Sequence, residues 1–373
     1  MTLELRGVES LAGRERILFP LDLALEPGSI NVLLGPIRAG KTSLMRLMAG
    51  LDRPTSGRIL DDGRDVTGLD VRKRSASMVY QQFINYPSFT VFDNIASPLR
   101  VRGGRGRAAI EACVRDMAGR LGLTPLLGRL PAELSGGQQQ RTALARAMVT
   151  DSRLLLLDEP LVNLDYKLRE DLRAEMKDLF RQGNRIVVYA TTEPLEALML
   201  GGRTIVLREG RLLQEGPALD VYRRPETLEI ARLISDPPMN LLGGAIADGT
   251  VRLDGGAAFA APAGFSGLPA GRYTFGLHAA EMKAMAFPGA VDLPVVVDLA
   301  EINGSETLVH GSYGGAPVML QREGVHAVEI GSTMVLRFDP AALYGFDAAG
   351  GLARAPRFDR EPEEVRLGAD SAA

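Results

Sequence analysis

The stretch INVLLGPIRAGKTSLMRLMA, residues 30–49, decides the fold. Its middle matches the pattern G-x-x-x-x-G-K-[ST] from Gly35 to Thr42, between a strand-like run at Ile30–Leu34 and a helical run at Lys41–Ala49. In that context the backbone N–H groups of the loop and the N-terminus of the helix can surround phosphate oxygens. A glycine turn without a ligand is the alternative, and the flanking strand and helix count against it.

The loop also carries side chains suited to a nucleotide. The Lys41 ammonium can bridge β- and γ-phosphates, and the Thr42 hydroxyl can ligate Mg²⁺. The sequence therefore predicts a site for MgATP. Its predicted phosphate-binding residues are Gly35, Pro36, Ile37, Arg38, Ala39, Gly40, Lys41, Thr42 and Ser43.

Two acidic residues follow a second apolar run. Leu154–Leu157 reads as a buried strand and ends in Asp158 and Glu159. Ligands of α/β proteins bind at the carboxyl ends of such strands. Two acids after a strand are more often a solvated turn, but the phosphate loop upstream reverses those odds. Asp158 is suited to hold Mg²⁺ through water and Glu159 to polarise the attacking water.

Strands alternate with helices through the first part of the chain, which predicts an α/β fold with a parallel sheet covered by helices. The predicted elements besides those above are Leu3–Val8, Ile186–Tyr189, and a strand pair at Arg203–Arg208 and Gly210–Gln214 that turns at Glu209-Gly210. Residues of about 88–148, including Ala108–Leu121, read as a helical subdomain inserted into this fold. We expect this ATPase domain to span residues 1–238.

The composition changes after about Asn240, where short β-like runs with turn signals predict a small β-barrel or sandwich over residues 239–350. Residues 351–373 are expected to form a flexible tail. No basic aromatic face is evident in Gly271–Tyr344, so we expect no nucleic-acid partner. The β-like runs are Val295–Val297, Thr307–Val309, Val318–Gln321 and Thr333–Arg337.

Composition indicates an ordinary soluble protein. The 373 residues are 46% hydrophobic and 24% charged, with a net charge of −3, so no general affinity for nucleic acid or anionic lipid is expected. One cysteine, Cys113, cannot form an internal disulfide and suits a reducing compartment. Charged residues such as Glu4 and Arg6 interrupt the amino terminus where a secretory signal needs an apolar run. We expect a cytoplasmic protein that reaches a membrane by docking onto other chains.

The string LSGGQQQR, residues 134–141, lies between the phosphate loop and the strand carboxylates. Ser135 can cap a helix whose N-terminus, with glycines that permit close approach, can face a phosphate. Together the three motifs resemble the ATPases of ABC transporters. The resemblance implies that Ser135, Gly136, Gly137 and Gln138 contact the nucleotide held by an opposite subunit, so that two ATP molecules lie between two ATPase domains.

The same resemblance assigns further roles. Gln81 corresponds to the glutamine that contacts Mg²⁺ and the water, and Leu161–Asp165 resembles a loop that crosses the dimer interface. The subgroup that this chain resembles imports maltose-type sugars and glycerol phosphate, and the strings at Tyr222–Pro225 and Asp236–Asn240 resemble its links to the second domain. That domain is then an oligonucleotide-binding-like (OB-like) fold used for dimer contacts or regulation.

Three strings, at residues 39–46, 80–86 and 189–194, look most like one ATPase of a paired glycerol importer. We therefore expect glycerol or a related polyol as the solute, with a sugar or glycerol phosphate as the alternative. The implied partners are transmembrane permeases, a second ATPase subunit and, indirectly, an extracytoplasmic binding protein. The implied location is peripheral, on the cytoplasmic face of the membrane.

The chain departs from the family pattern at three positions. Thr192 stands where the family has a histidine that contacts the γ-phosphate, so we place Thr192 in the catalytic set as a replacement. No aromatic residue in Val8–Gly13 can lie under adenine, and Arg38 replaces a customary glycine. Because this subunit's own nucleotide lacks the histidine while its signature, Leu134–Gln138, is whole, we expect pairing with a non-identical ATPase.

Two other classes of function remain open at this stage. A soluble ABC ATPase acting on DNA or ribosomes would generally carry tandem ATPase domains or long coiled-coil insertions, which this chain lacks. A structural or regulatory subunit that binds nucleotide but scarcely hydrolyses it is favoured by Thr192 and by the absent aromatic residue. It is opposed by Lys41, Asp158 and Glu159.

Overall fold

The computed structural model describes residues 2–82, 84–162, 169, 173, 176, 180 and 184–358. The chain divides into two compact units, Met1–Leu219 and Asp220–Ala373. The expected domain limits at residues 238 and 350 stay predictions.

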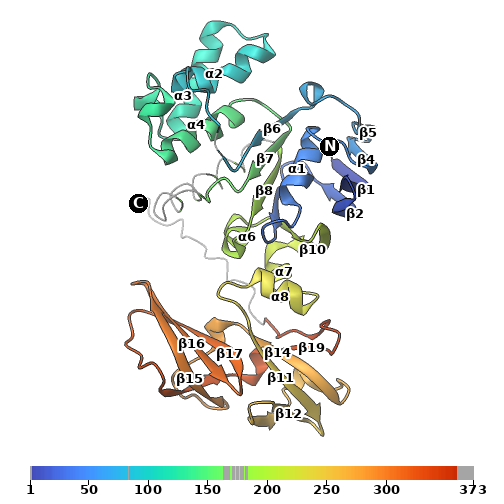
Figure 1. The fold of residues 1–373 in the computed structure, drawn as a ribbon, viewed down its shortest axis with the longest axis vertical. Coiled ribbons are helices and arrows are strands. Elements are labelled where there is room, and N and C mark those ends of the chain that lie inside the picture. Colours follow the sequence, from blue (N-terminus) through green and yellow to red (C-terminus); the bar gives the residue numbers. More distant parts are fainter. Residues whose placement is uncertain are drawn as a thin grey trace, which may run out of the picture. The chain divides into compact units, whose positions relative to one another are not determined.

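The first unit is built on a sheet of six strands in the order β10-β9-β3-β8-β7-β6 (Figure 1). The pairs among β6, β7, β8, β3 and β9 are parallel, and only β10 is antiparallel to its neighbour. The strands are β3 (Ile30–Leu34), β6 (Ala76–Val79), β7 (Leu154–Asp158), β8 (Ile186–Thr191), β9 (Arg203–Arg208) and β10 (Arg211–Pro217). The helices α1 (Lys41–Ala49) and α6 (Pro194–Leu200) pack against them. The α/β fold with a parallel sheet is therefore confirmed.

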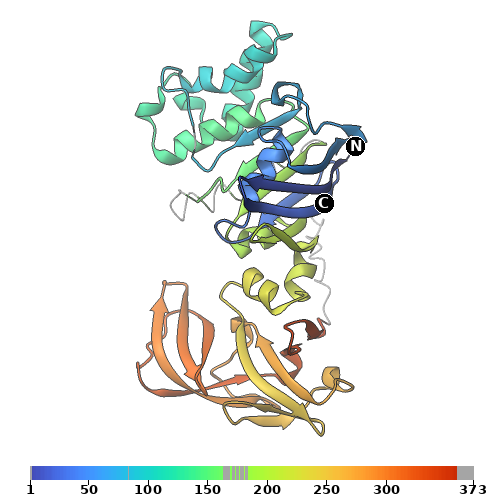
Figure 2. The ribbon, with the colours of Figure 1, turned by 45° about the vertical axis from the view of Figure 1, so that its right-hand side comes forward.

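A second, antiparallel sheet of the same unit has the order β2-β1-β4-β5. Figure 2 shows its longest strands, β1 (Leu3–Ala12) and β2 (Glu15–Leu25), in dark blue. The others are β4 (Ser56–Asp61) and β5 (Arg64–Asp65). Apolar side chains of both sheets and of α1 share one core that includes Leu5, Leu23, Leu33, Leu44 and Leu156.

Three helices follow β6 and gather into one cluster (Figure 1). They are α2 (Val91–Arg102), α3 (Arg107–Arg120) and α4 (Gly136–Met148), and α2 packs against both of the others. All three lie in the segment for which the sequence predicts an inserted helical subdomain. In the part of the chain that the structure describes, no helix is long and apolar enough to cross a membrane.

The second unit consists mainly of two antiparallel sheets, with orders β13-β12-β11-β14-β19-β20 and β17-β16-β15-β18 (Figure 1). One hydrophobic core joins the two sheets, with Leu242 and Phe275 from the first and Val295, Val309 and Leu336 from the second. The predicted runs near residues 295, 307, 318 and 333 are strands here. Whether the fold is OB-like stays a prediction.

The elements of this unit, with α7 at the division between the units, are α7 (Ala218–Arg223), α8 (Leu228–Ile234), β11 (Asn240–Ala247), β12 (Thr250–Leu253), β13 (Ala258–Ala260), β14 (Gly271–Leu277), β15 (Val291–Ile302), β16 (Glu306–Tyr313), β17 (Ala316–Glu323), β18 (Thr333–Phe338), β19 (Tyr344–Phe346) and β20 (Leu352–Arg354). Strand β20 pairs with β19, so residues 352–354 of the expected tail belong to a sheet. Residues from 359 onward lie outside the described part of the chain.

Candidate nucleotide site

The carboxyl ends of three parallel strands bring the predicted residues together. The loop after β3 starts at Gly35, β7 ends at Asp158, and the chain leaves β6 for Gln81. Because β3 pairs with β8, β8 with β7 and β7 with β6 in parallel, these ends meet at one edge of the sheet. We call this set, Gly35–Ser43 with Gln81, Asp158 and Glu159, the phosphate edge.

The phosphate loop is folded around the Lys41 ammonium. Lys41 Nζ donates to the carbonyl oxygens of Gly35 at 2.6 Å and of Pro36 at 3.1 Å, and lies 3.1 Å from Glu159 Oε1. Its side chain is only 5% exposed. A Cβ at Gly35 would lie 2.1 Å from the Leu207 carbonyl oxygen, so the close passage of the loop over β9 requires glycine there.

The two carboxylates of the phosphate edge have different partners. Thr42 Oγ1 donates to Asp158 Oδ2 at 2.7 Å, and Gln81 Nε2 donates to Glu159 Oε2 at 3.0 Å. Burial raises the pKa of Asp158 above its usual value and the Glu159 charge adds to this, whereas the Thr42 hydrogen bond and the Lys41 charge oppose it. Hydroxyl, carboxylate and amide oxygens are hard ligands, so this donor set fits Mg²⁺.

Two non-glycine residues of the phosphate edge have backbone angles in the left-handed region. Glu159 has φ 45° and Arg38 has φ 68°. Strained backbone of this kind concentrates at functional sites. Glycine adopts a positive φ without steric cost, whereas an arginine at position 38 does not. The Arg38 side chain is exposed.

A cavity of about 810 Å³ opens at the phosphate edge. Its volume is within the range of ligand sites. Four lining residues were not predicted from the sequence, because their spacing does not connect them with the loop: Glu15, Arg16, Ile17 and Glu209. The lining is Glu15, Arg16, Ile17, Ile37, Arg38, Ala39, Gly40, Lys41, Thr42, Ser43, Gln81, Glu159 and Glu209.

Thr192 follows the carboxyl end of β8 and is half-buried. Among the described residues that line the cavity, Thr192 is absent. Its loop is held instead by a buried carboxylate, because Glu196 Oε2 accepts from Tyr189 Oη at 3.1 Å and Thr191 Oγ1 at 2.5 Å. Arg173 Nη2 pairs with Glu196 at 3.0 Å and with Glu193 at 2.7 Å. The catalytic role assigned to Thr192 stays a prediction.

The signature residues Ser135–Gln138, which we call the signature end, begin α4. Ser135 Oγ accepts from Gln138 N at 3.4 Å, and Gln138 Oε1 accepts from Ser135 N at 3.1 Å, which is a reciprocal capping box. Ser135 and Gly136 are exposed, Gln138 is half-buried and Gly137 is buried. In the described lining of the cavity, none of these residues occurs. The structure therefore does not bring the signature end to this chain's own phosphate edge.

The three histidines belong to the second unit. His278 stacks on Tyr222 and lies 3.3 Å from Tyr344 Oη, and burial lowers its pKa to about 4. His310 Nε2 lies 3.1 Å from Glu301, and His326 Nε2 lies 2.7 Å from the Glu323 carbonyl oxygen. Each of the three histidines thus has a partner within the second unit. Of the predicted interface loop, Leu161 and Val162 are described, whereas residues 163–165 lie outside the described residues.

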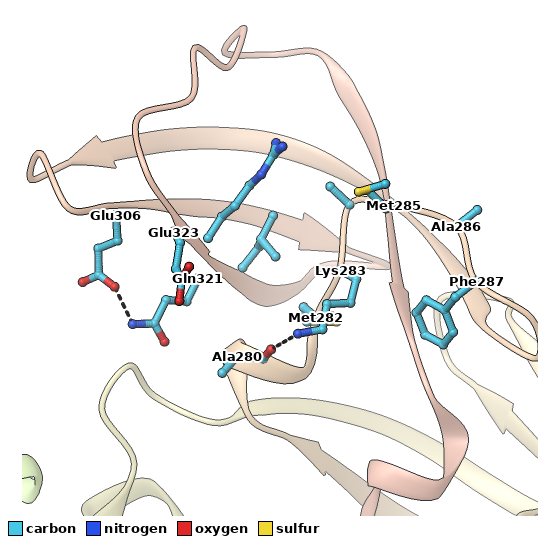
Figure 3. Close-up of a pocket in the computed structure, with 12 residues that line it drawn as sticks. Ala280, Met282, Lys283, Met285, Ala286, Phe287, Glu306, Gln321 and Glu323 are labelled. Carbon is cyan, nitrogen blue, oxygen red and sulfur yellow. Dashed lines mark hydrogen bonds between the residues drawn. The ribbon is translucent and has the colours of Figure 1, made fainter. Parts of the chain in front are cut away.

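A second cavity, of about 620 Å³, lies in the β-sheet unit between the segment Ala280–Phe287 and β17 (Figure 3). Its polar groups bind one another: Lys283 Nζ donates to the Ala280 carbonyl oxygen at 2.8 Å, and Gln321 Nε2 donates to Glu306 Oε2 at 2.6 Å. The phosphate edge, with its buried lysine and converging carboxylates, is the stronger candidate for chemistry.

Comparisons with known proteins agree with this choice. A family model described as ABC transporter matches residues 18–162. An sn-glycerol-3-phosphate import ATP-binding protein of Pectobacterium atrosepticum is 38% identical over 353 residues, covering 94% of this chain and 98% of the relative. The protein of the same description from Cupriavidus pinatubonensis is 37% identical over 363 residues, with the same coverage.

A solved structure is also similar to this chain. The dimeric post-hydrolysis state of an ATP-binding cassette bound to ADP and Pi is 27% identical, with a TM-score of 0.53, over 58% of this chain and 98% of the cassette. The fold and the phosphate edge thus define an ATP-binding cassette ATPase. The chain belongs to the ABC transporter family, as the ATP-binding subunit of an importer, in which ATP hydrolysis is coupled to transport.

Proposed function

We propose that this chain binds MgATP at the phosphate edge and couples its hydrolysis to the uptake of glycerol or a related polyol. The observation that carries the ATP site is the convergence of Lys41, Thr42, Asp158 and Glu159 at one edge of the sheet, within 2.7–3.1 Å of one another in pairs. The solute rests on subgroup resemblance, since no residue of this chain is expected to contact it.

Each residue of the phosphate edge takes the role that its chemistry suits. Lys41 exchanges its carbonyl contacts for the β- and γ-phosphates, and the loop N–H groups surround the phosphate oxygens. Mg²⁺ would be held by Thr42, Asp158 through water, and Gln81, and would neutralise phosphate charge. Glu159 polarises the attacking water, which lies between it and the γ-phosphate.

The signature end serves a second ATPase subunit. Ser135 and Gly136 are exposed at the positive end of the α4 dipole, where a phosphate held by another chain is stabilised. Gly137 and Gln138 complete this surface. Since Thr192 stands in place of the family's histidine, we propose that the partner is a non-identical ATPase that retains it.

The remaining partners follow from the importer class. Membrane-spanning permeases carry the solute, an extracytoplasmic binding protein delivers it, and this chain docks on the cytoplasmic face of the membrane. No nucleic acid is involved. The second unit, proposed as OB-like over residues 239–350, serves dimer contacts or regulation.

A second solute is favoured by the comparisons. The two relatives named above are described as sn-glycerol-3-phosphate import proteins, and both match almost their full length to this chain. Uptake of labelled glycerol and of labelled sn-glycerol-3-phosphate in cells lacking this subunit distinguishes the two solutes. We expect glycerol uptake to fail and to return with the wild-type chain but not with Lys41→Ala. Unchanged glycerol uptake with failed sn-glycerol-3-phosphate uptake would replace the polyol proposal by the second candidate.

A further inference from the structure

The cavity at the phosphate edge extends beyond the space that phosphates need. Phosphates bound by the loop occupy the end of the cavity at Ile37–Ser43, which leaves the wall formed by Glu15, Arg16, Ile17 and Glu209 for the base of the nucleotide. Among the described residues that line the cavity there is no aromatic side chain. Apart from Arg38 of the phosphate loop, Arg16 is the one arginine among the described residues that line the cavity.

Contacts on the protein side hold the Arg16 guanidinium in place. Arg16 lies on β2 opposite Leu11 of β1, and its Nε is 2.8 Å from Glu9 Oε1. The guanidinium carbon is 4.9 Å from the centroid of the Phe19 ring. The Arg16 side chain is nevertheless 46% exposed, so part of it stays available to a ligand.

We propose that the Arg16 guanidinium stacks on the adenine base and takes the place of the missing aromatic ring. A guanidinium is planar, delocalised and weakly hydrated, so it stacks on π-systems where an ammonium does not. Proteins that bind single-stranded RNA use arginine planes on bases in the same way as aromatic rings. It rests on the proposed ATP site, and it gives the adenine a stacking partner in a chain with no aromatic residue in Val8–Gly13.

The test distinguishes binding of the adenine base from binding of the phosphates. Binding of Mg²⁺-ATP and of Mg²⁺-tripolyphosphate to the full-length protein is measured by titration calorimetry. We expect Arg16→Ala to weaken ATP binding about tenfold and to leave tripolyphosphate binding unchanged, because only ATP has a base to stack. Arg14→Ala is the matched control, since Arg14 is an exposed arginine of the adjacent turn that is absent from the described cavity lining.

Two further variants separate the plane of the guanidinium from its charge. Arg16→Tyr keeps a planar group and should bind ATP close to wild type, whereas Arg16→Lys keeps the charge and should bind as weakly as Arg16→Ala. If Arg16→Ala lowers the melting temperature, the comparison of Arg16→Tyr with Arg16→Lys still tests whether the plane of the guanidinium binds the base. Equal weakening of ATP and tripolyphosphate, or full ATP affinity in Arg16→Lys and Arg16→Ala, would overturn the proposal while the ATP site stands. Failure of the wild type to bind ATP would overturn both.

Discussion

The phosphate edge and the signature end differ in how far their polar groups are buried and in what those groups contact. At the phosphate edge, Lys41 and Asp158 are 5% and 4% exposed; Lys41 forms an ion pair with Glu159, and Asp158 accepts a hydrogen bond from Thr42. At the signature end, Ser135 and Gly136 are exposed and their hydrogen bonds only cap the helix. The first region is built to hold a ligand within one chain. The second presents a helix N-terminus outward, as a region that serves another subunit's ligand would.

The largest effect is expected at Lys41. Lys41→Ala removes the cation that meets the β- and γ-phosphates, so ATP affinity should fall about a hundredfold or more. The measurement is the ATP-induced rise in melting temperature. Lys73→Ala, which removes an exposed lysine, is the control and should keep the full rise. Equal shifts in wild type and Lys41→Ala would contradict the assignment of the phosphate edge.

Asp158 should give the phosphate edge a pH dependence. Because burial raises its pKa in the folded state, protonation stabilises the folded protein, and the ionised form lowers the stability of the nucleotide-free protein at neutral pH. Asp158→Asn should therefore raise the free energy of unfolding at pH 7 without nucleotide and abolish the Mg²⁺ dependence of ATP binding. Acidification should weaken wild-type Mg²⁺-ATP binding. Urea denaturation and ATP titration check both effects, and a less stable Asp158→Asn would count against the account.

A substitution of the helix cap at the signature end should change the stability of the isolated chain but not its ATP binding. Ser135→Ala removes the acceptor for Gln138 N, which should lower the free energy of unfolding by about 1 kcal/mol. ATP binding to the isolated chain should stay unchanged, because the described cavity lining does not include Ser135. Loss of ATP affinity in this variant would place the signature end at the chain's own nucleotide and remove the contrast between the two regions.

The smallest effect is expected at Arg38. An L-residue in the left-handed region costs about 1–2 kcal/mol. Glycine avoids this cost, but it loses more conformational entropy on folding, which cancels part of the gain. Arg38→Gly should therefore raise the free energy of unfolding by about 0.5–1 kcal/mol. Denaturant unfolding measures this. An unchanged or lower stability would show that the Arg38 side chain makes contacts that offset its backbone strain.

The local sequence pattern was sufficient to predict much of the fold. The runs Ile30–Leu34, Lys41–Ala49 and Arg203–Arg208 are elements with the predicted limits, because apolar strands and a glycine-flanked helix are local signals. The turn at Glu209-Gly210 has positive φ at both residues, as a two-residue hairpin requires. The phosphate edge was predictable because parallel strands end together.

Features that depend on contacts between separate segments of the chain could not be predicted from the sequence. The sheet β2-β1-β4-β5 was missed, since its register joins residues such as Leu5 and Ile59 that are far apart in the chain. Arg16 lies in the same sheet, on β2 opposite Leu11 of β1, and lines the cavity. The anchor of the loop after β8, Glu196 with Arg173, also depends on contacts between separate segments, and no motif marks it.

We propose that this subunit supplies its signature to a complete site on a non-identical partner, while its own site is impaired. In the described structure an added Cβ at Gly136 has nothing within 4 Å, so Gly136→Asp should leave the subunit folded and act only against an incoming phosphate. Gly106, the N-cap of α3, is equally open, and Gly106→Asp is the matched control. Glu159→Gln removes the water-polarising group of this chain's own site.

The decisive measurement is the ATPase rate of the reconstituted transporter that carries each of these variants in this subunit. The account predicts that Gly136→Asp abolishes most turnover, that Glu159→Gln retains a substantial part, and that Gly106→Asp matches wild type. Turnover lost in Glu159→Gln and spared in Gly136→Asp would contradict it. Full ATPase activity of the purified chain as a homodimer would contradict it equally.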